Sequence, residues 1–431
     1  MSSKLAEIEN TPTFSNGYIL SPVEERFWCH FVNATADVIA LPSETSSSDE
    51  KDPLISYIIS NPQRDTLVLK SILCLGASHL VNTLPKESKG AQDLIRTKQC
   101  ILASAVRELS ARESSFTSRE RMTTDTIQDY EALITGYMLL YLYHLSEGSE
   151  EPSWRTWLDK AREVFSSVLS SHTAVRLPAT NEGENRGREI DINLRKDLDR
   201  LKVNKSVMRL FAYHDILAGV TDTPQREVYD ALRAPSRISS QLLQAGYFGA
   251  EDDAWTYHGL LQLIAHVHAL QLDSQRSSSP SETTIPRAVR LWQEIIDWRG
   301  PPDSKYRHLH EAYITAISIW IFCIIHPGDI AGDKVQSMVL GGLESLESVD
   351  ESALQTASLF PFFIIGVCCI RDTDRRLIEA MMEKLDEIRG LRYIRVCIDA
   401  IRRTWGRYDR GAQRSWDWHL LIRESPGLLL A

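Results

Sequence analysis

The chain has 431 residues, enough for one large domain or two modest ones. Its apolar fraction of 43% and charged fraction of 25% are ordinary for a folded protein, which excludes a chain too polar to build a core. The formal net charge of −10 repels polyphosphate at long range, so nucleic-acid binding would need a local basic patch.

The cysteines and the N-terminus predict an intracellular protein. The seven cysteines are odd in number and none forms a C-x-x-C pair, which favours reduced thiols. The first residues have neither a basic n-region nor an apolar h-region, so they do not resemble a signal peptide. The longest apolar run, Ala312–Ile325, is shorter than the roughly 20 residues that span a bilayer. We therefore expect no membrane partner and a buried core helix over that run.

Apolar residues repeat at helical spacing along most of the chain, and few segments alternate with the period of a strand. The first predicted helix is Val23–Ala40, with Ser21 as its N-cap and Pro22 at its first position. Further helices are predicted from Asn61-Pro62 to about Leu80, over Ala91–Arg112, from Thr124 through Leu145, and from Ser153 onward.

Polar stretches without periodicity predict exposed loops near residues 42–53, 181–195 and 274–281, after a flexible N-terminus over 1–20. The stretch 181–195 could divide two halves, but helical patterns resume on both sides of it without a change in composition. We therefore expect one all-α domain over residues 21–431, built as a helical bundle or an α-solenoid-like array.

The segment Val207–Val220 places a histidine and an aspartate at the edge of an apolar helix face. At 100° per residue, His214 shares the face of Phe211 and Leu217, and Asp215 lies at its flank. Such a pair can hold a metal ion or orient a base, which makes His214 a candidate catalytic residue and Asp215 a candidate metal ligand. The alternative, which we favour, is a buried histidine satisfied by a hydrogen bond, with Asp215 paired to an arginine.

A cluster of acidic and basic residues, RDTDRR, directly follows an apolar run. Asp372 and Asp374 are candidate Mg²⁺ ligands, because Mg²⁺ prefers carboxylate oxygens and often shares them with substrate phosphates. Arg375 and Arg376 are candidate donors to those phosphates. The alternative, which we again favour, is the start of a helix with acidic residues in its first turn and solvated arginines.

The most basic stretch is Arg389–Arg414, which holds eight arginines against only Asp399 and Asp409. Apolar residues make up its opposite face, so the pattern predicts an amphipathic helix. Its arginines are candidates to contact a diphosphate, an acidic partner or nucleic acid, although such a row is most often a solvated face. No G-x-S-x-G, P-loop or G-x-G-x-x-G motif is present.

Five segments follow one another along most of the chain: VEERFWCHFVNATADVIA, NPQRDTLVLKSILCLGASHL, FAYHDILAGV, LFPFFIIGVCCIRDTDRRLIEAMMEKL, and the closing Trp416-Asp417-Trp418. Their order resembles the fungal-specific transcription factor domain that follows a zinc cluster in many fungal regulators. The resemblance implies an all-α domain. A zinc cluster needs six closely spaced cysteines beginning C-x-x-C-x6-C, and the chain contains no such pattern. No agent of direct nucleic-acid binding is therefore visible.

A helical domain without a DNA reader also looks like the humulene-synthase family of fungal tropolone–sesquiterpenoid pathways. That resemblance implies a terpene cyclase of secondary metabolism, with farnesyl diphosphate, a prenyl diphosphate, as its partner and Mg²⁺ as its cofactor. Ionising the diphosphate needs Mg²⁺ on carboxylates and arginine or lysine on the leaving group. Cyclising the cation needs a dry pocket lined with aromatic rings. The motif D-D-x-x-D, which gathers Mg²⁺ in many terpene synthases, is absent.

Two functions of different classes follow from these resemblances. The one we favour from the sequence is the cyclase, an enzyme in the cytoplasm. The alternative is a transcription-factor-like regulatory or protein-interaction domain without its own DNA reader, located in the nucleus. Such a domain would act through protein contacts, as a helical homodimer for example, with the basic row Arg389–Arg414 as its interaction face.

Overall fold

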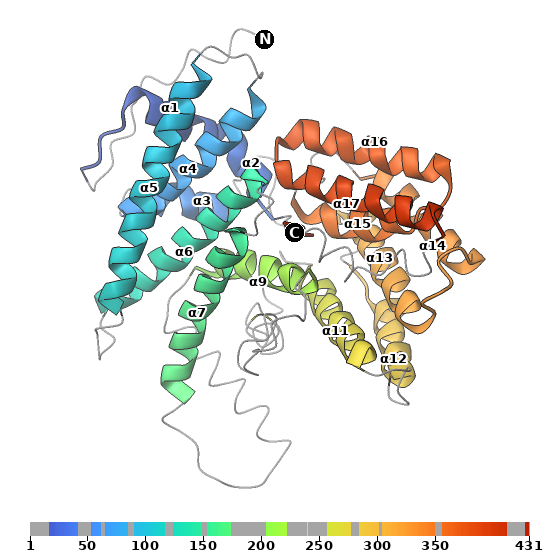
Figure 1. Cartoon of the computed structure of the whole chain (residues 1–431). Coiled ribbons are helices and arrows are strands. Elements are labelled where there is room, and N and C mark those ends of the chain that lie inside the picture. The colour runs from blue at the N-terminus through green and yellow to red at the C-terminus, as the bar shows by residue number, and fades with distance from the viewer. Residues whose placement is uncertain are drawn as a thin grey trace.

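The computed structural model consists of helices joined by loops (Figure 1). The structure describes residues 17–41, 53–61, 65–84, 90–116, 124–148, 153–173, 204–221, 239, 257–276, 284–300, 304–349, 356–411 and 427–430. Within these ranges the regular elements are helices and no strand occurs, which confirms the all-α prediction.

Several sequence predictions fall outside the described residues. The predicted loop 181–195, most of 42–53 and the segment Trp416–Trp418 all lie there. The third predicted loop begins later than expected, because residues 274–276 still belong to helix α11 (Tyr257–Arg276). The division into a flexible N-terminus and one domain stays a prediction.

The first predicted helix forms, but as three joined pieces. Ser21 caps α1 (Pro22–His30) through a capping box with Glu24, as the sequence predicts. A π-helical turn, η1 (Phe31–Thr35), and a short helix, α2 (Ala36–Ile39), then continue the rod. This rod packs closely on helix α4 (Thr66–Thr83), since a Cβ at Gly76 would lie 2.6 Å from the carbonyl oxygen of Phe27. Glycine at this position is therefore what allows the two backbones to approach.

The first half of the fold surrounds helix α4, which contacts α1, α5 and α6 (Figure 1). The sequence places the start of this helix at Asn61-Pro62, but it begins at Thr66. The reason is local, because the Asp65 carboxylate accepts hydrogen bonds from the backbone N–H groups of Leu67 and Val68 and so acts as the N-cap. The helices of this half are α1, α2, α3 (Pro53–Ser60), α4 (Thr66–Thr83), α5 (Ala91–Phe116), α6 (Thr124–Glu147) and α7 (Ser153–Thr173).

The second half surrounds helix α13, which contacts α11, α12, α14 and α15. Contacts of α9 with α6 and α11, and of α17 with α6, join this half to the first, and Figure 1 shows α9 running between the two. Its elements are α9 (Lys205–Val220), α11, α12 (Thr284–Asp297), α13 (Arg307–Ile325), α14 (Asp333–Glu347), the 3₁₀ turn η3 (Thr356–Ser358), α15 (Leu359–Val367), α16 (Asp372–Arg389) and α17 (Arg392–Asp409).

Within the described residues, two helices, the central α4 and α13, are long and apolar enough to cross a membrane by length and composition. In this fold 72% and 61% of their apolar windows are buried inside the protein. The run Ala312–Ile325 therefore forms a buried core helix, as the sequence predicts. Its Trp320 is fully buried, and the indole donates a hydrogen bond to the side chain of Gln271 on α11.

Candidate functional site

Helix α9 carries the histidine–aspartate pair through the middle of the protein. Asn204 caps it by accepting a hydrogen bond from the backbone N–H of Ser206. From Leu210 to Val220 every residue is buried. Both His214 and Asp215 therefore lie in the interior, and their roles depend on which groups face them there.

Asp215 forms a buried ion pair with Arg162, which confirms the prediction that it pairs with an arginine. The Nε of Arg162, on α7, donates to one oxygen of Asp215 at 2.5 Å, and the hydroxyl of Ser239 donates to the other at 2.5 Å. Burial lowers the pKa of Arg162, but attraction to Asp215 and Asp159 outweighs burial, so its pKa is raised. The carboxylate of Asp215 is thus occupied by protein donors that tie α9 to α7.

His214 has a different partner from its neighbour. The hydroxyl of Tyr141, on α6, forms a 3.0 Å hydrogen bond with His214 Nδ1, and the rings of Tyr141 and Tyr213 lie edge-on to the imidazole. Burial lowers the pKa of His214 to about 3, because the apolar surroundings disfavour its charged form. The imidazole is therefore neutral, and Asp215 does not orient it.

Asp372 and Asp374 lie in the first turn of α16, which confirms the prediction that they begin a helix. Asp372 is the exposed first residue of the helix. Asp374 is buried, and its carboxylate accepts hydrogen bonds from the Nε of Arg371 at 3.0 Å and from the hydroxyl of Thr373 at 3.1 Å. Negative charge at a helix N-terminus is stabilised by the backbone dipoles, which is a sufficient reason for both residues.

The two arginines proposed for a diphosphate have different surroundings. Arg375 donates two parallel hydrogen bonds of 2.8 Å to Asp409 on α17, and a third to the carbonyl oxygen of Cys369. Its guanidinium also lies over the ring of Trp405. Arg376 is exposed. Arg375 is therefore used to hold α17 against α16, and the structure does not bring the two guanidinium groups onto a common partner.

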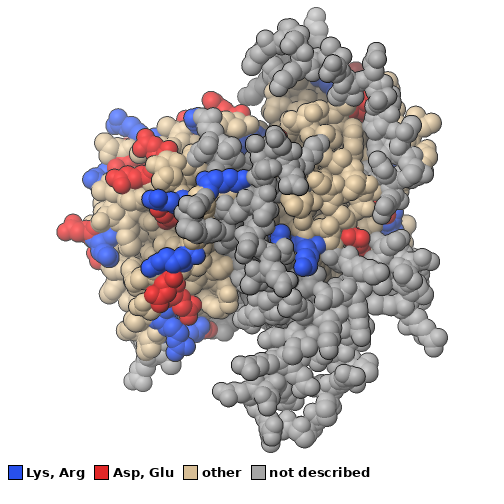
Figure 2. Space-filling model, turned by 180° about the vertical axis from the view of Figure 1, so that it is seen from behind, with Lys and Arg blue, Asp and Glu red and all other residues tan. Residues whose placement is uncertain are grey.

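Two arginines of the basic row on α17 pair with acidic residues of α16. Arg402 pairs with Glu379 and Glu383, and Arg395 pairs with Asp386 at 2.7 Å. Figure 2 likewise shows blue and red side chains interspersed on the face that it draws, with neither sign forming a continuous patch among the coloured residues. An amphipathic helix forms as predicted, but these arginines serve a helix pair.

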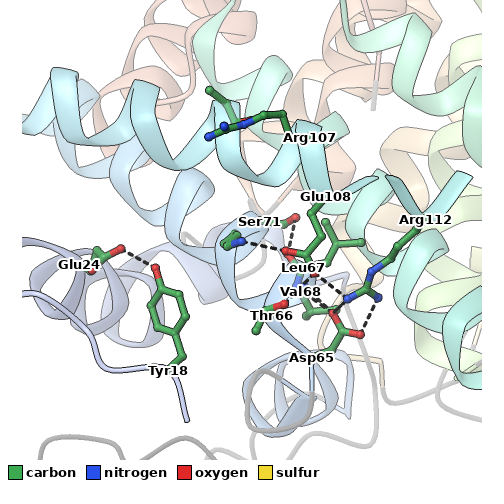
Figure 3. Close-up of polar contacts among 12 residues, drawn as sticks. Tyr18, Glu24, Asp65, Thr66, Leu67, Val68, Ser71, Arg107, Glu108 and Arg112 are labelled. Carbon is green, nitrogen blue, oxygen red and sulfur yellow. Dashed lines mark hydrogen bonds and ion pairs between the residues drawn. The ribbon is translucent and has the colours of Figure 1, made fainter. Parts of the chain in front are cut away.

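A second polar network lies between α4 and α5 (Figure 3). Arg112 donates to both oxygens of Asp65 and to Glu108, and Glu108 also accepts from Lys70 and Thr66. Each carboxylate of this network is matched by protein donors. The network therefore holds the start of α4 against α5, and its carboxylates are already used by protein donors.

The candidate metal ligands are not gathered into one site. Within the described ranges, no group of three or more His, Cys, Asp and Glu side chains is positioned to hold a metal ion. Asp215 faces Arg162 on α7, whereas Asp372 and Asp374 lie at the start of α16. The Mg²⁺ cofactor and the catalytic role of His214 stay predictions that belong to the cyclase interpretation.

Arg389, the last residue of α16, is a buried arginine that the sequence does not distinguish from its neighbours. It is 4% exposed, although it belongs to a row expected to face solvent. Burial lowers the pKa of Arg389 to about 10, and Tyr393 on α17 and Tyr213 on α9 partly offset this shift. Its only sequence mark is the following Gly390, which ends the helix in a left-handed conformation with φ +60°.

Comparison with known proteins identifies the family. A model of the fungal specific transcription factor domain matches residues 26–431. No curated protein and no solved structure matches the chain.

The family match overturns the cyclase interpretation, because it points to a regulatory domain of the kind stated as the alternative. The lyase, sesquiterpene and magnesium assignments lose their support with it, and the resemblance to the humulene-synthase family is unconfirmed. The error came from giving weight to the missing zinc cluster and to a suspected family without a catalytic motif, whereas the ion pair of Asp215 and the helix start at Asp372 are the structural alternatives favoured from the sequence. Since the match covers nearly the whole sequence, the chain belongs to the family of the fungal specific transcription factor domain.

Proposed function

We propose that this protein is a regulatory domain of fungal transcription control that acts through contacts with other proteins. The observation that carries the proposal is the family match over residues 26–431. The cysteine pattern of a zinc cluster is absent from the 431 residues, so DNA contact is assigned to a partner. The ion pairs of Arg395 and Arg402 on α17 support this assignment, because carboxylates of α16 already neutralise these two arginines.

A reporter experiment in yeast tests this function. The full chain is fused to a heterologous DNA-binding domain and tethered upstream of a reporter gene, with the DNA-binding domain alone as the control. We expect reporter transcription to change several-fold in either direction, and the tagged chain to accumulate in the nucleus. An unchanged reporter at equal expression, together with exclusion of the chain from the nucleus, would contradict the proposal.

A gel-shift experiment tests the assignment of DNA contact to a partner. The purified chain is mixed with promoter DNA at physiological salt. We expect no sequence-specific shift. A shift that competes with specific but not with random DNA would show a reader within the chain and would contradict this part of the proposal.

A further inference from the structure

A pair of histidines connects the first helices of the chain to the second half of the fold. His30, the last residue of α1, lies beside His79 on α4, with its Nε2 3.1 Å from Nδ1 of His79. The other ring nitrogen of His79, Nε2, forms a 2.9 Å hydrogen bond with the backbone carbonyl oxygen of Arg389, the last residue of α16. The imidazole of His79 therefore bridges α1 and α16, which belong to different halves of the molecule.

Other contacts at this junction hold the end of α16 close to the first half. Nη1 of Arg389 donates to the carbonyl oxygen of Val38 on α2 at 3.3 Å, and Figure 1 shows α2 next to α16. A Cβ at Gly390 would lie 2.8 Å from Cγ2 of Thr83 and 3.7 Å from Nε2 of His79, so the chain leaving α16 passes close to α4. The histidine pair is thus part of a tight contact between the two halves.

The hydrogen bonds determine where the protons of the pair lie. A carbonyl oxygen only accepts, so Nε2 of His79 carries a hydrogen and Nδ1 of the neutral ring holds a lone pair. That lone pair faces Nε2 of His30 and the hydroxyl of Thr35, which lies 3.0 Å away in the π-helical turn η1. One added proton can be shared between the two facing nitrogens, but a second would set two N–H groups against each other.

Burial and positive charge keep this pair neutral. Burial lowers the pKa of His30 to about 4, and positive charge on His79 or on Arg26 lowers it further. Burial also lowers the pKa of His79, against the hydrogen bond to the Arg389 carbonyl, which raises it. The guanidinium of Arg389 lowers the pKa of His79 as well. A proton on the pair therefore places a charge in the interior next to an arginine.

No carboxylate among the described residues forms an ion pair with His30 or His79. The carboxylates on the elements that pack here lie at the other end of a helix, are exposed, or are already paired: Glu24 and Glu25 in the first turn of α1, Asp37 on α2 and Glu387 on α16, which are exposed, Glu147 of α6, paired with Lys98 of α5, and Asp386 of α16, paired with Arg395 of α17. A charged pair thus lacks the counter-charge that would stabilise it in the folded state.

We propose that the His30–His79 pair is a proton-sensitive contact between the two halves, and that the junction of α1, η1 and α2 with α4 and the end of α16 opens when the pair takes up protons. His30 is partly exposed and receives the proton, whereas His79 and Thr35 are buried. Opening hydrates the charge and lets both rings be protonated, so a falling pH favours the open junction. As a means of regulating partner contacts this rests on the proposed function, whereas the opening itself does not.

The direction of the pH dependence follows from the lowered pKa values. The neutral pair stabilises the junction fully above about pH 6.5, the ordinary pKa of histidine, and this contribution is lost as the pH falls toward 4. Each histidine that is protonated only in the open junction favours opening by up to about tenfold per pH unit below 6.5.

Hydrogen exchange of the full chain, read by mass spectrometry, measures this opening. Protection factors, which are corrected for the pH dependence of intrinsic exchange, are compared at pH 7.5 and 5.5 in peptides from α1–η1 and from the end of α16. We expect them to fall by about tenfold or more at the junction. Peptides from α13, the central helix of the second half, are the reference and should lose less protection. An equal loss in both regions, or none at the junction, would overturn the proposal.

Replacing His30 by glutamine tests the pair directly. The amide of His30→Gln still offers an N–H to His79 but takes up no proton, so about a factor of ten should vanish from the loss of protection at pH 5.5. His308→Gln, on an exposed histidine of α13 that lies against Glu311, is the matched control and should behave as the wild type. A loss of protection in His30→Gln equal to that of the wild type would overturn the proposal.

Nitrogen NMR of the wild type labelled at histidine tests the arrangement without a substitution. At pH 7.5 we expect two neutral rings, with the hydrogen of His79 on Nε2. A hydrogen on Nδ1 of His79 instead, or charging of the pair near pH 6.5 without loss of protection, would refute the proton-sensitive contact. The expected exchange pattern in a chain whose tethered reporter is unchanged would leave the contact and remove the transcriptional function. A flat pH dependence with an active reporter would do the reverse.

Discussion

Replacing Asp215 by asparagine tests the buried ion pair between α9 and α7. Asparagine keeps the size of the side chain but removes the charge that faces Arg162. The side chain of Asp215 is 0% exposed and that of Arg162 is 15% exposed, so water cannot replace the lost partner. Breaking a buried pair in this way costs about 3–5 kcal/mol. Arg162 still has Asp159 at 2.6 Å, but that carboxylate is 43% exposed and contributes less. We therefore expect the free energy of unfolding to fall by about 3 kcal/mol.

Urea unfolding followed by circular dichroism measures this loss as a lower midpoint with an unchanged slope. The double variant Arg162→Met/Asp215→Leu should recover most of the stability, because apolar side chains can replace a buried pair without leaving a lone charge. Arg96→Met, on the exposed pair with Asp93 in α5, is the control and should change the midpoint little. A midpoint for Asp215→Asn equal to that of the wild type would show that the pair does not hold these helices together.

Three further predictions concern a histidine, a glycine and a helix cap. Because burial lowers the pKa of His214 to about 3, its neutral form stabilises the fold above about pH 6.5, and this contribution falls by about 1.4 kcal/mol per pH unit as the pH drops toward 3. His214→Gln should flatten the pH dependence of urea unfolding between pH 6 and 4, and an unchanged slope would contradict the burial argument. Gly148→Ala should destabilise more than Gly411→Ala in thermal unfolding, since both residues have positive φ but only a Cβ at Gly148 would clash with Cβ of Arg392. Equal losses of stability in the two variants would show that backbone strain alone sets the cost and that the contact with Arg392 adds nothing. Asp65→Ala should cost about 1–2 kcal/mol or more by urea unfolding, since the cap of α4 is lost together with a partner of an arginine, and a smaller change would mean that solvent replaces the cap.

The positions of most helices could be predicted from the local sequence pattern. Ser21 and Pro22 start α1 as predicted, the acidic first turn of α16 lies where the pattern puts it, and the run Ala312–Ile325 is a core helix. These features depend on neighbours within one or two turns, so a local pattern contains the information. The order of the segments also indicated the family that the comparison then identified.

The tertiary structure decided what the polar residues do. The sequence shows Asp215 beside His214, but its partner, Arg162, lies 53 residues away on another helix. Likewise, Arg389 and Arg395 belong to one arginine row, yet Arg389 is buried with no counter-charge among the described residues, whereas Arg395 is paired with Asp386. Burial and pairing depend on which helices pack together, and side-chain periodicity along one helix does not specify the partner helix. The burial of Arg389 is therefore a feature of the packed fold that no motif in the sequence indicates.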